Sequence, residues 1–194
     1  MGARRCGCPH GRHPDGRDPA GRVRRVRLSA PSDSLLFRLA GRVGRKLTCT
    51  GSSLATAESC TAGWVAKSLT DIPGSSGWFG SGFITYSNEA KTRMLGVSRQ
   101  VLARHGAVSE QCVRAMAAGA VRASGARFAV AVSGIAGPGG ATAGKPVGTV
   151  WFCIAAKRGR GIDFVPAVKH FRGNREAVRR KSVAQALSMV LRCL

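Results

Sequence analysis

Hydrophobic residues recur along the chain at two spacings, and these predict helices and strands in turn. Leu35, Leu36, Leu39 and Val43 repeat at the spacing of one helix face, which indicates an amphipathic helix. Short apolar runs bounded by Gly, Ser and Asp residues indicate strands. The predicted helices cover residues 34–46, 61–70, 88–95 and 109–124, with a last one that Asn174 can cap. The predicted strands cover residues 53–57, 82–86, 127–132, 149–156 and 162–171.

This alternation of helices and short strands is typical of a layered α/β domain. The last two predicted strands are joined across residues 157–161 and form a hairpin, which adds antiparallel pairing to the sheet. A chain of 194 residues with 44% hydrophobic residues has room for one domain of ordinary size. We therefore expect a single α/β domain with a mixed sheet.

The first 33 residues have a different composition from the rest. Gly, Pro, Arg and Asp dominate there, and large apolar residues are nearly absent. Such a segment cannot bury enough surface to offset its ordering entropy. We expect a disordered basic extension at 1–33 and a folded domain at 34–194. Within the extension, Cys6, Cys8, His10 and His13 follow a zinc-binding pattern, but the spacing is far shorter than in known fingers, so we expect no metal.

The formal net charge of +22 raises the possibility of nucleic-acid binding. Aromatic residues make up only 6% of the chain, so stacking platforms are scarce, and nonspecific, salt-sensitive binding to polyanions is the expected effect. The seven cysteines match no disulfide framework, and no secretory signal or run of about 20 apolar residues is present. We expect a cytoplasmic protein with reduced thiols and no membrane partner.

Two glycine- and hydroxyl-rich junctions are candidates for substrate binding. The first, residues 57–63, leads from a strand into a helix, where backbone N–H groups could hold an anion. The second, residues 133–140, has glycines dense enough to let the backbone approach a ligand closely, although it matches neither a Walker A loop nor a dinucleotide fingerprint. A capped turn and a flexible loop are the alternatives. The candidate binding residues are Glu58, Ser59, Thr61, Ser133, Gly134 and Gly137.

A third junction holds a candidate catalytic group. Ser76 lies in a Gly-Ser turn, Tyr86 ends a predicted strand, and Lys91 lies one turn into the next helix. A lysine that is neutral, through burial or a nearby cation, can serve as the base for a serine nucleophile. A plain turn with a solvated lysine fits the same spacing. Only His105 and His170 lie in the expected folded region, so a His-based triad or a metal hydrolase is poorly supplied.

Several segments together resemble the CinA C-terminal domain family. They read TAESCTAGWVAKSLTDIPGSSGWF, GFITYSNEAKTRMLGV, HGAVSE, SGIAGPGG and KPVGTVWF, in order and with matching spacing over residues 34–194. The resemblance implies a three-layer α/β/α sandwich and a metal-free Ser–Lys amidase that needs no cofactor. The family's stand-alone members are nicotinamide-nucleotide amidases. The expected substrate is therefore nicotinamide mononucleotide, hydrolysed to nicotinic acid mononucleotide and ammonia.

The resemblance also implies roles for individual residues. Ser76 matches the nucleophile, Lys91 the general base and Tyr86 a supporting hydroxyl. Ser133 stands at the head of the GIAGP loop, and Arg175 matches a substrate-contacting arginine.

One mild departure falls in the first junction, where the family usually has SCTGG and this chain has Ala62. Three other hydroxyls, of Ser59, Thr61 and Ser133, are the remaining candidates should Ser76 not be the nucleophile. Two further readings stay open: a catalytically silent member that binds a nucleotide or a protein, and a competence- or nucleic-acid-associated protein. A homo-oligomer is compatible with all of these.

Overall fold

Five strands form one mixed sheet in the computed structural model, which describes residues 30–194. They are β1 (Leu54–Glu58), β2 (Phe79–Ile84), β3 (Phe128–Gly134), β4 (Thr149–Arg158) and β5 (Gly161–His170), in the spatial order β2-β1-β3-β4-β5. β1 runs parallel to both of its neighbours, β2 and β3. β4 and β5 continue the sheet with antiparallel pairing, as the predicted hairpin requires.

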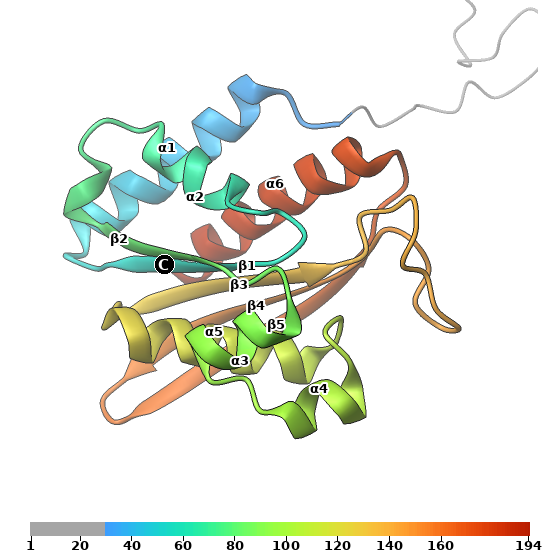
Figure 1. Ribbon diagram of the computed structural model, residues 1–194. Helices are drawn as coiled ribbons and strands as arrows, with labels where there is room; N and C mark the ends of the chain where they lie inside the picture. Colours follow the sequence, from blue (N-terminus) through green and yellow to red (C-terminus); the bar gives the residue numbers. More distant parts are fainter. Residues whose placement is uncertain (1–29) are drawn as a thin grey trace, which may run out of the picture.

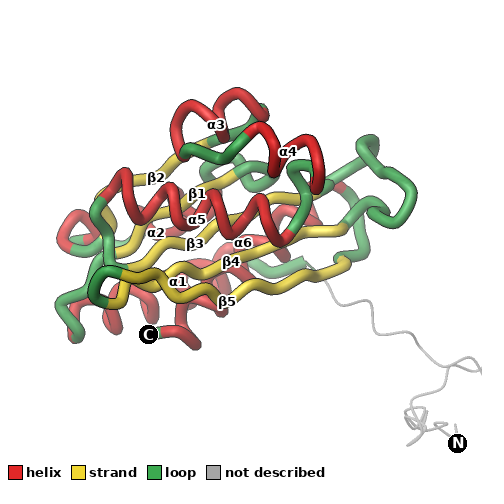
Figure 2. Tube along the Cα trace, turned by 90° about the horizontal axis from the view of Figure 1, so that it is seen from below, coloured by secondary structure: helices red, strands yellow, loops and turns green. Residues whose placement is uncertain are grey.

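Helices cover both faces of this sheet, which confirms the predicted three-layer α/β/α fold (Figure 1). One layer contains α1 (Asp33–Cys49), α2 (Trp64–Thr70) and α6 (Arg175–Cys193). The other contains α3 (Asn88–Leu95), α4 (Arg99–His105) and α5 (Glu110–Ser124). Figure 2 shows α5 lying across the strands with α3 and α4 beside it. Separate hydrophobic clusters fill the two sides, so the central strands β1 and β3 are buried on both faces.

Polar caps set where the helices begin. Ser87, Ser98, Ser109 and Asn174 each accept a hydrogen bond from a backbone N–H in the first turn of α3, α4, α5 and α6. The α4 helix was not predicted, because none of its residues is buried and no apolar stripe marks it. The start of β2 was predicted too late, because Gly80 and its neighbours interrupt the alternation of that edge strand.

A close helix contact places α3 under the sheet. A Cβ atom on Gly119 of α5 would lie 2.0 Å from the Leu95 carbonyl oxygen at the end of α3. Only glycine therefore allows the two helices to approach this closely. The contact holds α3, which carries Lys91, against α5 in the same helix layer.

The parallel strands direct their carboxyl ends to one edge of the sheet, at the right of Figure 1. The chain leaves β1 toward α2 on one face and leaves β2 toward α3 on the other. Such a switch point at the carboxyl ends of parallel strands is where open α/β sheets bind ligands.

Some of the predicted features lie outside the described residues. The extension predicted at 1–33 is described only from residue 30 onward, and the Cys6/Cys8/His10/His13 pattern lies wholly before it. Within residues 30–194 the cysteines are free thiols, and none of the helices combines the length and apolar character needed to cross a bilayer.

Candidate active site

A buried lysine and a buried serine meet at the carboxyl edge of the sheet. Ser59 directly follows β1, and Lys91 is in the first turn of α3. The Lys91 Nζ lies 3.2 Å from the Ser59 Oγ, and the two side chains are 1% and 8% exposed. A hydroxyl nucleophile within hydrogen-bond reach of an amine base is the arrangement that activates serine.

The surroundings of Lys91 favour the neutral amine. Burial lowers the pKa of the Lys91 ammonium because desolvation disfavours its charged form, against weaker opposing effects of Cys112, Cys60 and Glu89. The Nζ donates to the Thr85 carbonyl at 2.8 Å and, more weakly, to the carbonyl of the following residue at 3.5 Å. A neutral amine has two N–H donors and one lone pair. In the charged form the third N–H donates to the Ser59 Oγ, whereas in the neutral form the lone pair can accept the Ser59 hydroxyl proton.

Ser76 does not join this pair, and the predicted Ser76–Lys91 contact is not formed within this chain. Ser76 is exposed in the short 3-10 helix Ser75–Gly77, which precedes β2, whereas Lys91 follows β2. The intervening strand has six residues, a span of about 20 Å. In Figure 1 the α2–β2 connection that holds Ser76 is at the left of the sheet, opposite the loops that follow β1 and β2. The serine that contacts Lys91 is Ser59, which the sequence analysis named as a binding residue.

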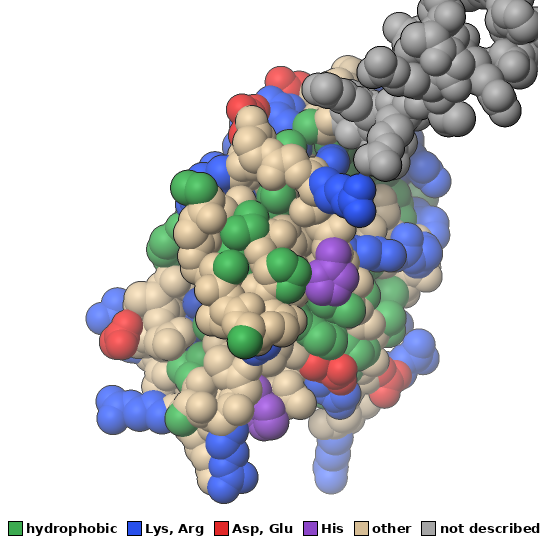
Figure 3. Space-filling model, turned by 90° about the vertical axis from the view of Figure 1, so that its right-hand side faces the viewer, with side chains coloured by type: hydrophobic (Ala, Val, Ile, Leu, Met, Phe, Trp, Pro, Cys, Tyr) green, Lys and Arg blue, Asp and Glu red, His purple; other side chains and the backbone are tan. Residues whose placement is uncertain are grey.

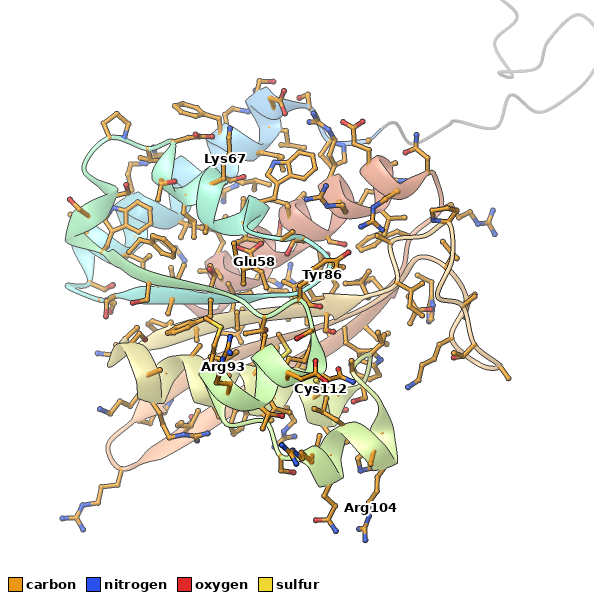
Figure 4. The ribbon with its side chains drawn as sticks, viewed as in Figure 1. Glu58, Lys67, Tyr86, Arg93, Arg104 and Cys112 are labelled. Carbon is orange, nitrogen blue, oxygen red and sulfur yellow. The ribbon has the colours of Figure 1, made fainter. Side chains whose placement is uncertain are left out.

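Glu58, predicted to bind substrate, instead holds the start of α2. Its carboxylate is 1% exposed and accepts hydrogen bonds from the backbone N–H groups of Gly63, Val65 and Ala66 at 3.0, 3.1 and 2.8 Å. Negative charge at a helix N-terminus is favourable, and here it is fully hydrogen-bonded. Figure 4 shows Glu58 on the α2 side of the sheet and Cys112 on the opposite side. The N–H groups expected to hold an anion at the helix start are thus occupied.

Other donors beside Ser59 remain free. Among the described residues, the backbone N–H groups of Cys60 and Thr61 have no hydrogen-bond partner. The Thr61 Oγ1 is also buried without a partner there. The Ala62 N–H closes the turn onto the Ser59 carbonyl oxygen at 3.0 Å, and Ala62 has the left-handed φ of 50°. Free N–H groups directly after a nucleophile are suited to bind an oxyanion.

Tyr86 and Arg175 link two loops at the mouth of the site. Arg175, at the start of α6, donates to the Gly137 carbonyl at 2.7 Å and to the Tyr86 hydroxyl at 2.9 Å. Gly137 has φ +84°, which glycine adopts without strain. Tyr86 is 58% exposed and lies beyond the end of β2 (Figure 4). The structure therefore brings these three predicted residues together, and the catalytic role of Tyr86 and the substrate contacts of Arg175 and Gly137 stay predictions.

Ser133 and Gly134 have structural contacts at the end of β3. The buried Ser133 Oγ donates to the Ala107 carbonyl at 2.8 Å and so fixes the loop that leads into α5. Ser133 follows Val132, whose carbonyl accepts from the Ser59 N–H, so it lies near the turn formed by residues 59–62. A Cβ on Gly134 would lie 2.8 Å from a carbonyl oxygen of β4, which explains glycine at this position.

Arg179 is a residue of the site that the sequence analysis missed. Its Nε donates to the Cys60 carbonyl at 3.1 Å and its NH2 to the Thr61 carbonyl at 2.9 Å. The available signal was its spacing, because Arg179 lies one helical turn after Arg175 and therefore on the same face of α6. Within residues 30–194, no three His, Cys, Asp or Glu side chains are grouped so that they could hold a metal ion.

Comparisons with known proteins agree with this fold and this arrangement of motifs. A family model described as the CinA C-terminal domain matches residues 36–194. The chain is 55% identical over 156 residues to the nicotinamide-nucleotide amidohydrolase PncC of Escherichia coli (strain K12), covering 80% of this chain and 93% of that protein. The PncC of Pseudomonas putida is 50% identical over 153 residues, with 79% and 93% covered. The crystal structure of the competence/damage inducible protein CihA from Agrobacterium tumefaciens has a TM-score of 0.76 at 43% identity, with 84% and 96% covered.

Proposed function

The chain belongs to the CinA C-terminal domain family, and on this premise we propose that it hydrolyses the carboxamide of nicotinamide mononucleotide. The products are nicotinic acid mononucleotide and ammonia, a step in pyridine nucleotide recycling. Relatives named nicotinamide-nucleotide amidohydrolase, 50% to 55% identical over most of the chain, support this substrate. The observation that carries the proposal is the buried Ser59–Lys91 pair with its 3.2 Å contact.

In the first half-reaction, neutral Lys91 removes the proton from the Ser59 hydroxyl. The Ser59 Oγ forms a bond to the carboxamide carbon, and the carbonyl oxygen takes up the negative charge. The free N–H groups of Cys60 and Thr61 stabilise that oxygen. The Lys91 ammonium then gives its proton to the departing nitrogen, the C–N bond breaks, and ammonia leaves an acyl ester on Ser59.

Water completes the reaction at the same base. Lys91, neutral again, takes a proton from a water molecule whose oxygen attacks the ester carbon. The C–O bond to Ser59 breaks, and the proton on Lys91 returns to the Ser59 Oγ. The acid product leaves as its carboxylate. No step requires a metal or a cofactor.

Charge around the site supports an anionic nucleotide as substrate. Arg175 is hydrogen-bonded to Tyr86 and to the loop after β3, and these three are the proposed contacts for the ribose and phosphate. Lys and Arg side chains border the face of the molecule that carries these loops (Figure 3). With a formal net charge of +22, the protein attracts a phosphate-bearing substrate before contact.

The test is ammonia release from nicotinamide mononucleotide by the purified protein in a metal-free buffer. The proposal expects stoichiometric ammonia and nicotinic acid mononucleotide, with a rate that a chelator leaves unchanged. Binding of the nucleotide without any release would identify a silent member of the family. Activity lost to a chelator and restored by zinc would overturn the Ser–Lys mechanism.

A further inference from the structure

The guanidinium of Arg179 contacts the nucleophile turn, residues 59–62, from the helix layer opposite to the one that holds Lys91. It reaches from α6 and donates to two successive carbonyl groups, those of Cys60 and Thr61. Its planar group also lies over the Trp64 ring, with 5.1 Å between the guanidinium carbon and the ring centroid. Two hydrogen bonds and a stacking contact fix the orientation of this side chain.

These two bonds contribute to where the neighbouring N–H groups point, together with the Trp64 N–H, which donates to the same Thr61 carbonyl at 3.1 Å. In a trans peptide the C=O and the following N–H are antiparallel within one plane. The carbonyl of Cys60 shares its peptide with the Thr61 N–H, so holding that carbonyl toward Arg179 turns this N–H away from α6. The carbonyl of Thr61 shares its peptide with the Ala62 N–H, which closes the turn onto Ser59. A cation at the carbonyl end also polarises each peptide and strengthens its N–H as a donor.

The Thr61 N–H is directed away from Arg179, and Ser59, which contacts Lys91, lies close by in the chain and in the fold. The Thr61 N–H has no partner among the described residues. Lys91 contacts Ser59 from α3, in the layer on the other side of the sheet from α6. Arg179 and Lys91 thus contact the backbone and side chains of residues 59–61 from opposite helix layers.

We propose that Arg179 is a positioning residue that holds the 60–62 backbone so that the Thr61 N–H faces the carbonyl oxygen of the scissile amide. Arg179 itself does not touch the substrate. The inference rests on the proposed Ser59 chemistry and adds a residue that acts on the transition state through the backbone.

Arg180 is a matched control on the same helix. Its guanidinium lies over the same Trp64 ring, with 5.0 Å to the centroid. Its hydrogen bonds go instead to Glu176, Asp33 and the Pro31 carbonyl, away from the nucleophile turn. Substitution of either arginine by lysine removes a guanidinium from this indole, but of the two arginines only Arg179 donates to the carbonyls beside Ser59.

The experiment compares Arg179→Lys with Arg180→Lys in ammonia release from nicotinamide mononucleotide. Lysine keeps the charge but lacks the planar fork that donates to two carbonyls. Arg179→Lys is expected to lower kcat by about a hundredfold, as loss of an oxyanion donor does, while KM stays within about twofold. The pH inflection from Lys91 is expected to stay in place. Arg180→Lys is expected to keep kcat near that of the wild type.

Chemical rescue separates positioning from general damage to the fold. Added methylguanidinium is expected to restore part of the kcat of Arg179→Ala and to leave that of Ser59→Ala unchanged. A kcat within about twofold of the wild type for Arg179→Lys would overturn the inference. Equal losses in the Arg179 and Arg180 variants, with KM and melting temperature changing together, would also overturn it.

A substrate-independent readout keeps this test separate from the proposed function. A fluorophosphonate forms a bond to a serine Oγ and expels fluoride, with negative charge developing on an oxygen that needs the same donors. Mass spectrometry of the labelled peptide follows the rate at Ser59. Slow labelling in Arg179→Lys supports the inference even if the wild type releases no ammonia, a result that would remove the proposed substrate alone. Labelling at the wild-type rate would contradict it.

Discussion

The Lys91 Nζ lies 3.2 Å from the Ser59 Oγ, although the two residues are 32 positions apart in the chain. The contact forms because β1 and β2 are parallel neighbours and both side chains follow the carboxyl ends of these strands. Lys91 is 1% exposed, and its pKa is lowered by desolvation. The consequences for rate, stability and substrate binding can each be measured.

The first prediction concerns the pH dependence of the rate. Because burial lowers the pKa of Lys91, the amine is neutral at a lower pH than a free lysine, whose pKa is about 10.4. The value of kcat/KM should therefore rise with pH through an inflection below about 10.4, since the neutral amine is the base. Lys91→Met should lower kcat by at least about a thousandfold and abolish the inflection. An inflection retained in Lys91→Met would assign it to another group.

Lys91 should also affect stability, with a sign that depends on pH. Between the lowered pKa and about 10.4, the unfolded chain holds a proton on Lys91 that the folded protein lacks, so the unfolding free energy of the wild type rises with pH there. Lys91→Met removes this titration. The stability of the variant relative to the wild type should therefore be greatest at low pH and shrink as pH rises.

Urea unfolding of both proteins across this range measures that difference. The pKa of the Cys60 thiol is raised to about 12 and that of Cys112 to about 11, because burial disfavours both thiolates. These thiols destabilise the fold as pH rises above their unfolded pKa of about 8.5, and both are also coupled to the charge of Lys91, so the two proteins are compared below about pH 8.5, where both thiols stay protonated. A difference that does not change with pH would contradict a lowered pKa for Lys91.

Glu58→Gln should lower the unfolding free energy by about 2 kcal/mol, because an amide replaces a buried carboxylate that accepts three backbone N–H bonds. The matched control is Glu110→Gln. Glu110 lies in the first turn of α5 and pairs with Arg114 at the surface. The control should change stability by at most about 0.5 kcal/mol. Equal effects on the midpoint of urea unfolding would show that the cap on α2 contributes little.

Ala62→Gly should stabilise the protein. Ala62 has φ 50°, a left-handed conformation that costs a residue with a Cβ about 1 kcal/mol and that glycine adopts freely. Greater chain entropy in the unfolded state offsets part of this gain. The expected increase in unfolding free energy is about 0.5 kcal/mol. Ala66→Gly, within α2, should instead destabilise by about 0.5 to 1 kcal/mol. The same direction of change in both variants would contradict the strain at Ala62.

Tyr86 and Arg175 should act as a coupled pair in substrate binding. Tyr86→Phe removes the hydroxyl that accepts from Arg175, and Arg175→Lys removes the fork that also holds Gly137. Each variant should raise KM about tenfold, with an interaction energy of about 1 kcal/mol between the two substitutions. Steady-state kinetics of both single variants and the double variant measure this coupling. Strictly additive effects would mean that their hydrogen bond is unimportant for binding.

The layers of the fold were accessible from the sequence because the apolar periodicity of the long helices and the buried runs of β1 and β3 is strong. The α4 helix was not, since it buries none of its residues. Lys91 was singled out from the sequence, and the serine that the structure brings into contact with it is Ser59 rather than Ser76. Ser76 precedes β2, whereas Tyr86 and Lys91 both follow it, so the length of the strand separates Ser76 from these two residues. Attention to the carboxyl ends of the parallel strands would have favoured Ser59.

The hydrogen bonds of Glu58 and Arg179 were the hardest to predict from the sequence. The Glu58 carboxylate accepts hydrogen bonds from backbone N–H groups at the start of α2, five to eight residues further along the chain. The Arg179 contacts join residues about 118 positions apart and depend on α6 lying beside the 60–62 turn. The spacing from Arg175 places Arg179 on the same face of α6, but it does not predict which carbonyl groups Arg179 contacts, because that depends on how the helices pack against the sheet.

The most direct measurement is ammonia release from nicotinamide mononucleotide by Ser59→Ala and Ser76→Ala side by side. Both substitutions remove one hydroxyl, but only Ser59 lies at Lys91. Ser59→Ala should lose at least about a thousandfold in kcat, as expected when one member of a catalytic pair is removed. Ser76→Ala should stay within about twofold of the wild type, because its exposed turn lies at the opposite end of β2. Near-normal turnover by Ser59→Ala, with loss in Ser76→Ala, would contradict the account.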